Sequence, residues 1–241
     1  MPNLDLISII DVESTGLNPI TDEVIELGCI LYSLSHNTVL QQVSTLVHVN
    51  KNLAENVNGI SAEAANSLDN VCHVFPLETA IRTLIQDADA VVAHKAAFDK
   101  AFISPYLDRF KADKLNWIDT MAITWPRAIR QGCNLVELAL AYSVPVWSNH
   151  RALTDCQLLS HIIQREPRAA ELLAKELEPK VWATWASTPA DKQGHARAKA
   201  AGFRWNDKNC PASGVWSRLM HPDDIAHLPF EVATMEAFSG V

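Results

Sequence analysis

The N-terminal part of the chain alternates between apolar runs and short polar turns. The run Leu6–Ile10 predicts a buried strand, and residues 23–34 and 39–49 predict two more. The polar segment 35–38 suits a hairpin turn between the last two. We therefore expect three consecutive antiparallel strands at the start of the fold.

Further along, segments with helical spacing of apolar positions alternate with short apolar runs. Ser61 follows a turn and is a plausible N-cap for a short helix. Further helices are expected at 76–87, 96–107, 134–142, 152–165 and 166–177, and short strands at 90–94 and 117–119. Strands followed by a mixed β/α series predict an α/β fold, a mixed sheet flanked by helices.

Length and composition favour a globular protein over a membrane or secreted one. The 241 residues suffice for one large domain with a small appendage. Apolar runs are far too short for a membrane span, and no secretory signal is evident at the N-terminus. The five cysteines include no Cys-x-x-Cys pair, which fits reduced thiols in a cytosolic protein. We therefore expect a cytoplasmic protein that does not contact membranes.

The C-terminal part differs in charge. Residues 187–191 read as a linker, so we expect one domain at 1–184 and a small α+β module at 189–241. The whole chain carries a formal charge of −8, which argues against a passive nucleic-acid coat, but residues 185–221 carry +4. The basic residues of this segment are Lys192, Arg197, Lys199, Arg204, Lys208 and Arg218.

Phe203, Trp205 and Trp216 are interleaved with these basic residues. Such a mixture can hold phosphates and stack bases, so the module is a candidate grip for nucleic acid. Alternatively, the tryptophans form the module's own core. We favour the core for Trp205 and Trp216, because so small a unit needs its aromatic side chains inside.

Two carboxylates, Asp11 and Glu13, stand at the end of the first predicted strand. Residues two apart on a strand point to the same face, so both side chains project together. Two ionised carboxylates this close repel each other unless a cation lies between them, and Mg²⁺ or Mn²⁺ fits that need. The pair alone could also be a solvated turn.

Later residues add to this pair. Asp99 falls in the first turn of a predicted helix, and Asp155 falls near the start of the helix at 152–165, with His150 in the loop before it. Five residues along one helix would turn His150 roughly 140° away from Asp155, so His150 must come from the loop. Asp119 is interpreted as a helix cap and His94 as a structural hydrogen-bonding residue, and neither joins the metal set.

The order of these motifs resembles the DEDDh family of 3′→5′ exonucleases, which includes the DNA polymerase III proofreading subunit, ribonuclease T, oligoribonuclease and exonuclease X. Asp-Val-Glu-Ser-Thr-Gly at 11–16 matches the first motif, His-Lys-Ala-Ala-Phe-Asp at 94–99 the second, and His-Arg-Ala-Leu-Thr-Asp at 150–155 the third. Lys95 stands where the family usually has Asn, and Asn58 where it usually has His.

The resemblance implies a ribonuclease H-like fold and a two-metal mechanism. Asp11, Glu13, Asp99 and Asp155 would hold two Mg²⁺ or Mn²⁺ ions about 4 Å apart, with Asp11 bridging both. His150 would take the proton from the attacking water. The product would be a 5′-mononucleotide.

The resemblance also implies contacts to the strand end from Ser14, Thr15, Leu17, Ile60 and Phe98. Ser14 and Thr15 would hold the terminal 3′-hydroxyl, Leu17 and Ile60 would wedge against the last base, and Phe98 would stack. Ordinary core packing is the alternative for each of them, above all for Phe98.

The expected activity is 3′→5′ hydrolysis of single-stranded nucleic acid, DNA favoured, in proofreading or repair. An RNA-trimming exoribonuclease of the same family is an alternative, and a catalytically silent nucleic-acid-binding protein is another. A structural Ca²⁺ domain is disfavoured by His150, because Ca²⁺ prefers oxygen ligands. A homodimer is also possible for this family.

Overall fold

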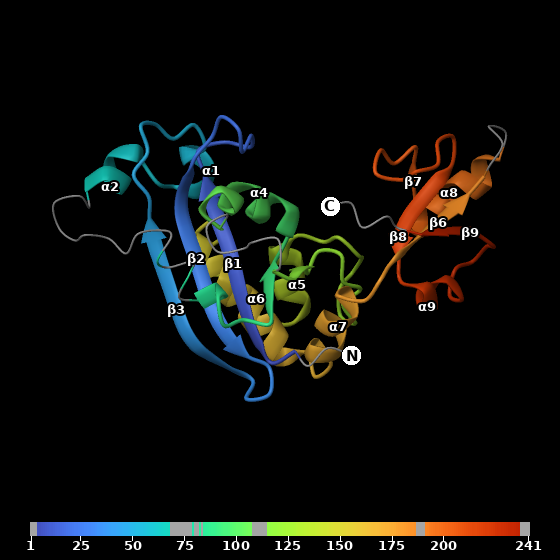
Figure 1. The fold of residues 1–241 in the computed structure, drawn as a ribbon, viewed down its shortest axis with the longest axis horizontal. Helices are drawn as coiled ribbons and strands as arrows, with labels where there is room; N and C mark the ends of the chain where they lie inside the picture. The colour runs from blue at the N-terminus through green and yellow to red at the C-terminus, as the bar shows by residue number, and fades with distance from the viewer. Residues whose placement is uncertain are drawn as a thin grey trace. The chain divides into compact units, whose positions relative to one another are not determined.

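The computed structural model describes residues 4–67, 79, 82, 84–107, 115–186 and 191–236. The chain forms two compact units, Met1–Leu177 and Glu178–Val241 (Figure 1). In the first unit the elements are β1 (Leu6–Ser14), β2 (Val24–Ser33), β3 (Thr38–Leu46), α1 (Glu55–Asn58), α2 (Ala62–Asn66), β4 (Ala90–Ala93), α4 (Ala96–Leu107), β5 (Trp117–Asp119), α5 (Leu135–Ala141), α6 (Ala152–Arg165) and α7 (Ala169–Glu176).

The first unit is built on one five-stranded sheet in the order β3-β2-β1-β4-β5. β1 to β3 are antiparallel, and β4 and β5 run parallel to β1. The predicted α/β class and mixed sheet are confirmed, and the arrangement is the ribonuclease H-like one. The expected helix at 76–87 lies largely outside the described residues, and so does most of the expected linker at 187–191.

Both faces of this sheet are buried. Ile7 and Ile9 of β1 pack in the apolar cluster that includes α5, α6 and α7, whereas Ile10 and Val12 pack in the cluster that includes α4. This division follows from the strand's period of two. Side chains at odd positions of β1 therefore face α6.

Helix α6 lies unusually close to β2, and Gly28 allows this approach. A Cβ atom at Gly28 would lie 2.3 Å from the carbonyl carbon of Ala152 and 2.4 Å from the amide nitrogen of Leu153. Gly28 is also the register partner of Asp11 across β1 and β2. The missing side chain therefore brings the first turn of α6 against the strand pair that carries Asp11.

The second unit contains a four-stranded sheet with the order β7-β8-β6-β9. Its elements are β6 (Val181–Trp185), α8 (Lys192–Ala200), β7 (Arg204–Trp205), β8 (Trp216–Met220), α9 (Pro222–Ile225) and β9 (Ala233–Glu236). The expected small α+β module is thus present, and the second compact unit begins at Glu178, before the expected start at 189. The reason is β6, which pairs with both β8 and β9 and so belongs to the second sheet.

The core of the second unit includes Ala183, Ala198, Phe203 and Met220, with Trp216 packed against it. The prediction that Trp216 helps to form this core is confirmed. Trp205 is different, because 48% of its surface is exposed, and its predicted place in the core is wrong. Among the described residues, no helix has the length and apolar character to cross a membrane.

We expect Gly28→Ala to destabilise the protein by about 3 kcal/mol, because the clash is with helix backbone that cannot rotate away. Thermal unfolding followed by circular dichroism measures this change. Gly132→Ala is the matched control, since nothing lies within 4 Å of a Cβ there and only its left-handed φ of 69° makes alanine unfavourable. The control should lose about 1 kcal/mol. Equal losses in the two variants would contradict the close approach of α6.

Candidate active site

Asp11 and Glu13 lie within β1 itself, which runs on to Ser14 and is longer than the predicted apolar run. They continue the row of Ile7 and Ile9, so their side chains face α6, as the period of two requires. The sequence prediction that both project together is therefore confirmed. Both side chains are partly shielded from solvent.

Asp155 in the first turn of α6 faces this pair. One possible ligand atom from each of Glu13, His150 and Asp155 lies within 4.8 Å of the other two. His150 is exposed in the loop before α6, as predicted, and has a left-handed backbone with φ of 58°. Its backbone N–H donates to Oδ2 of Asp155 at 3.1 Å, which ties the loop to the helix.

The start of α6 is held by a residue of β2. Glu26 is 2% exposed and accepts two hydrogen bonds from the Arg151 guanidinium, from Nε at 2.9 Å and from Nη2 at 2.8 Å. The same carboxylate accepts the backbone N–H of Ala152 at 3.0 Å. Arg151, the N-cap, makes no side-chain capping bond of its own. Glu26 therefore caps α6 from a different element and fixes the loop that carries His150.

Asp99 enters from the first turn of α4. It is 2% exposed, and its Oδ1 accepts the backbone N–H of Val12 at 3.1 Å. Val12 stands between Asp11 and Glu13 in the chain, so this bond brings Asp99 to the same part of β1. Negative charge in the first turn of a helix is also favoured by the helix dipole.

Burial and mutual repulsion make ionisation of these carboxyls unfavourable. Burial, followed by the charge of Asp155, raises the pKa of Glu13 to about 8. Burial likewise raises the pKa of Asp99 to about 8 and that of Asp155 to about 6. Asp11 has its pKa raised well above the ordinary value by burial and then by the charge of Asp99. Without a cation, the cluster is partly protonated near neutral pH.

The residues fit a hard divalent cation. Oδ1 of Asp155 is buried and has no hydrogen-bond partner, although a carboxylate oxygen in the interior ordinarily has one. Oxygen ligands of this kind are those that Mg²⁺ and Mn²⁺ prefer. A cation would meet the unpaired oxygen and relieve the repulsion among Asp11, Glu13, Asp99 and Asp155.

Three of the predicted strand-end contacts lie below the surface. Ser14 and Thr15 are 6% and 5% exposed, and Ile60 is 4% exposed and packs with Ile25. The Ser14 hydroxyl donates to the Gly16 carbonyl.

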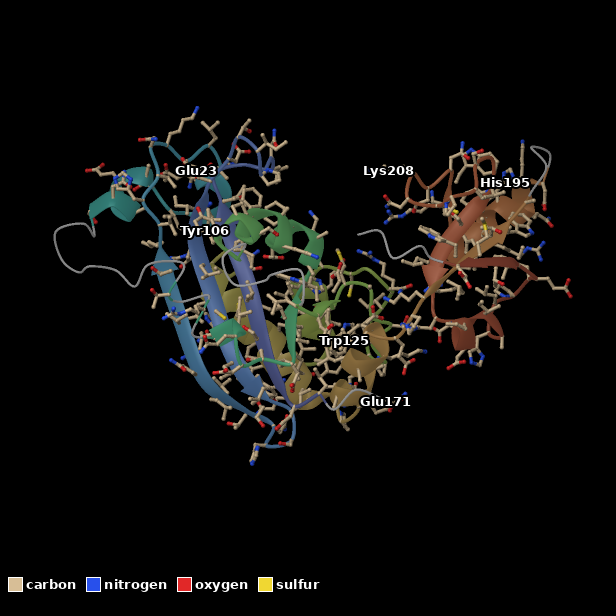
Figure 2. All side chains as sticks on the ribbon, in the orientation of Figure 1. Glu23, Tyr106, Trp125, Glu171, His195 and Lys208 are labelled. Carbon is tan, nitrogen blue, oxygen red and sulfur yellow. The ribbon has the colours of Figure 1, made fainter. Side chains whose placement is uncertain are left out.

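The backbone N–H of Thr15 donates to the Glu23 carbonyl at 2.9 Å, and Thr15 Oγ1 accepts the Glu23 N–H at 3.0 Å (Glu23 is labelled in Figure 2). These bonds join the two strands that flank the turn. Ser14 and Thr15 thus have a role in shaping the turn, and the direct contacts of Ser14, Thr15 and Ile60 with a strand end stay a prediction.

Leu17 and Phe98 are better placed than these residues to contact the end of a bound strand. Leu17 is 84% exposed on the loop after β1. Phe98 is partly buried, its ring centroid 4.8 Å from that of Phe102, and Nζ of Lys95 lies 5.4 Å from the Phe98 centroid. Lys95 has a left-handed φ of 89°, an unusual backbone for a lysine that marks the motif as locally strained.

Three other residues of the motifs have structural roles. The ring nitrogens of His94 lie 3.0 Å from Thr120 Oγ1 and from the Cys133 carbonyl, which confirms the structural interpretation. Asn58 is buried, accepts from the Asn52 side chain and the Ile60 N–H, and donates to the Ser14 carbonyl of β1 at 3.3 Å. Asp119 is not a helix cap, because it accepts the N–H groups of Lys95 and Met121 and is followed by turns.

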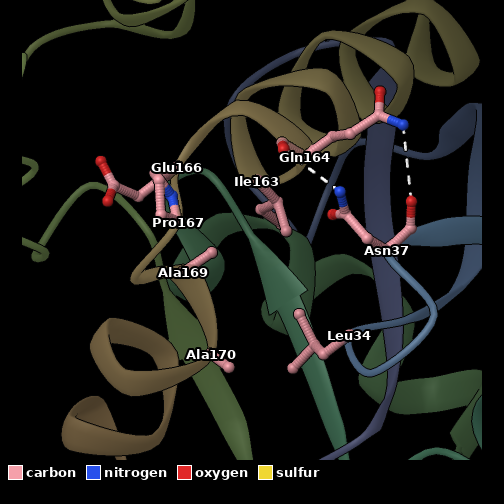
Figure 3. Close-up of a pocket in the computed structure, with 8 residues that line it drawn as sticks. All are labelled: Leu34, Asn37, Ile163, Gln164, Glu166, Pro167, Ala169 and Ala170. Carbon is pink, nitrogen blue, oxygen red and sulfur yellow. Dashed lines mark hydrogen bonds between the residues drawn. The ribbon is translucent and has the colours of Figure 1, made fainter.

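A separate pocket of about 220 Å³ lies at the other end of α6 (Figure 3). It is lined by Leu34, Asn37, Ile163, Gln164, Glu166, Pro167, Ala169 and Ala170. The Glu166 carboxylate is already bound by the Tyr142 hydroxyl at 2.6 Å and the Arg168 N–H at 3.0 Å. This pocket therefore lacks the reactive groups found at the first turn of α6.

Glu26 is not among the residues predicted from the sequence. A signal was present, since Glu26 is the one charged residue within the run Val24–Ser33, and a buried carboxylate must be paired. Its partner Arg151 is 125 positions away, so only the fold identifies it.

Comparison with known proteins supports the same family. The family described as Exonuclease (RNase_T) matches residues 8–163. A second match, over residues 187–235, is to a domain of unknown function, DUF8626.

The chain is 23% identical to the DNA polymerase III PolC-type of Thermotoga maritima over 161 residues, which cover 65% of this chain and 11% of that protein. It is 27% identical to the DNA polymerase III subunit epsilon of Treponema pallidum over 153 residues, 61% of this chain and 70% of that protein. The chain therefore spans about a tenth of the PolC-type relatives that it matches.

A solved structure described as full-length 3′-exonuclease has the same fold, with a TM-score of 0.52 and 15% identity over 70% of this chain and 84% of that one. The family match covers well over half of the chain, including all three acidic motifs. The chain belongs to the DEDDh, DnaQ-like family of 3′→5′ exonucleases.

Proposed function

We propose that the first unit removes 5′-mononucleotides from the 3′ end of single-stranded nucleic acid, with DNA as the favoured polymer. The observation that carries this proposal is the convergence of Glu13, His150 and Asp155 within 4.8 Å, beside Asp11 and the buried Asp99. A protein that only binds nucleic acid does not require a cluster of carboxylates, whose mutual repulsion destabilises the fold.

Asp11, Glu13, Asp99 and Asp155 would hold two divalent ions, Mg²⁺ or Mn²⁺. Bound there, the ions would lower the pKa of a water molecule and neutralise the leaving 3′-oxygen.

His150 would accept the proton of the attacking water, since its imidazole is exposed in the loop before α6, beside Glu13 and Asp155. The new bond joins the water oxygen to phosphorus as the bond to the 3′-oxygen breaks. The products are a 5′-mononucleotide and a strand shortened by one residue. Glu26 and Arg151 act by holding the His150 loop against β2.

Two residues are proposed to meet the strand end. Leu17 is exposed beside the turn after β1 and can wedge against the terminal base. Phe98, under the Lys95 ammonium, can contact the sugar or base. The names of the epsilon and PolC-type relatives favour DNA over RNA.

We expect stepwise loss of mononucleotides from the 3′ end of single-stranded DNA carrying a 5′ label, supported by Mg²⁺ or Mn²⁺ and abolished by chelator. RNA of the same sequence should be cut more slowly. Asp11→Ala and Asp155→Ala should abolish the activity, and His150→Ala should lower kcat about 10²- to 10⁴-fold, the range for a lost general base.

Glu63→Gln is the control for charge, because Glu63 is exposed on α2, far along the chain from the acidic motifs. Circular dichroism should show that each inactive variant is folded. Wild-type rates in Asp155→Ala would contradict the metal assignment. Absence of cleavage with every polymer would favour the catalytically silent nucleic-acid-binding protein.

The raised pKa values predict how metal-free protein responds to pH. Glu13 and Asp99 hold protons up to pKa values of about 8 when folded, far above the ordinary values of 4.5 and 3.8. The folded state thus binds more protons than the unfolded state. In chelator, stability should be greatest near pH 5 and should fall as pH rises through 8.

Mg²⁺ should restore stability most strongly at pH 8.5, where protons no longer compete for the carboxylates, by about 2.7 kcal/mol at a hundredfold excess over Kd. Thermal unfolding at pH 5.5 and 8.5, with NaCl of matched ionic strength as control, measures this. The Glu13→Gln/Asp155→Asn variant should lose the Mg²⁺ effect and only part of the pH dependence, because the buried Asp99 and Asp11 remain. Equal Mg²⁺ stabilisation at the two pH values would refute the site.

A further inference from the structure

A row of tryptophans crosses the sheet of the second unit. Trp205, Trp216 and Trp185 are register partners on β7, β8 and β6, so their side chains share one face. The ring centroids of Trp205 and Trp216 are 6.0 Å apart. The row ends at the outer strand β7, where Trp205 is 48% exposed although its neighbours are partly buried.

Helix α8 packs on the same face. A Cβ atom at Gly194 would lie 2.5 Å from the Trp185 ring, and His195 lies 5.6 Å from Trp216 and 6.4 Å from Trp185, measured between ring centroids. The side of α8 that carries His195, which is labelled in Figure 2, therefore borders the tryptophan row.

Two lysines flank His195 on that side of the helix. Lys192 and Lys199 lie three residues before and four residues after His195, so the three side chains fall within about 60° around the helix axis. Both lysines are exposed. Within the described part of the chain, neither lysine forms an ion pair.

Of the other basic residues on these elements, Arg218 follows Trp216 by two positions on β8 and so shares its face, where it donates to the Ala201 carbonyl at 2.7 Å. Arg197 and Arg204 point elsewhere. Arg197 is five residues from Lys192, which turns it roughly 140° away around α8. Arg204 precedes Trp205 on β7, so its side chain is on the opposite face of the sheet. Only part of the unit's positive charge thus borders the tryptophan row.

We propose that Trp205, Lys192 and Lys199 form a binding site for single-stranded nucleic acid, with an unpaired base stacked on Trp205 and backbone phosphates paired with the two lysines. Base stacking on an exposed aromatic ring beside positive charge is the usual chemistry of such sites. An unpaired strand is favoured over a duplex because its bases expose their faces. The choice of nucleic acid over an acidic protein draws on the function proposed for the first unit.

The test is binding of fluorescein-labelled oligothymidylate, about 20 nucleotides long, to the full chain in chelator, where no hydrolysis is expected. Trp205→Ala should weaken binding at least about fivefold, with Trp205→Phe retaining most of the affinity. The Lys192→Ala/Lys199→Ala variant should also bind weakly. Its slope of log affinity against log salt should be smaller by about 1.4, since each phosphate contact to a single strand contributes about 0.7.

The Arg197→Ala/Arg204→Ala variant is the matched control, because it removes equal charge from the same elements on other faces. It should stay close to wild type in affinity. Unchanged binding by Trp205→Ala would overturn the proposal. Equal losses of affinity in the lysine and arginine variants would also overturn it, because they would indicate unspecific electrostatic attraction. Competition by polyglutamate that depends on the lysines but not on Trp205 would indicate an acidic protein partner and would also overturn it.

Failure here is separable from failure of the proposed exonuclease. Binding in chelator requires no turnover, and hydrolysis of a trinucleotide, too short to need a second binding site, reports on the first unit alone. A folded Trp205→Ala variant should cut the trinucleotide at the wild-type rate.

Discussion

The bond between the buried Glu26 of β2 and the first turn of α6 is the constraint on which the active site depends. Glu26 takes two hydrogen bonds from Arg151 and one from the Ala152 N–H, so helix and strand meet at one carboxylate. Gly28 allows the same contact sterically, since any side chain there would enter the helix backbone. Asp155 and the His150 loop follow directly from this junction, and their distance to Glu13 is therefore fixed by β2.

The site is an unfavourable arrangement of charge that the surrounding fold stabilises. Glu13 and Glu26 are register partners on β1 and β2, where like charges repel. Arg151 pairs with Glu26 and also lowers the pKa of Glu13, so one cation serves two acidic residues. Backbone N–H groups support Asp99 and Asp155. No such compensation reaches Oδ1 of Asp155, and this is where a metal ion would complete the site.

Local patterns predicted the strands and helices, because the spacing of apolar positions, two in a strand and 3.6 in a helix, involves only neighbouring residues. The acidic motifs were recognised in the same way, from short segments and their order along the chain. Helix α6 and helix α4 begin and end where apolar spacing placed them. Long-range contacts were beyond such reasoning. The pairing of Glu26 with Arg151, the approach at Gly28 and the burial of Ile60 each depend on segments distant in sequence, and so does Asp119, which accepts the Lys95 N–H.

The start of the second unit also depends on strand pairing between distant segments. The run Val181–Trp185 precedes the polar linker and was therefore assigned to the first domain, but its strand partners follow it in sequence. Because β6 belongs to the second unit, its sheet and helix α8 bury most of the aromatic side chains of that unit. Trp205 can therefore remain exposed. An acidic site repels phosphate until cations occupy it, whereas residues 185–221 carry +4. Attraction for a polyanion and the chemistry performed on it therefore need opposite charge, which favours placing them on separate segments of the chain.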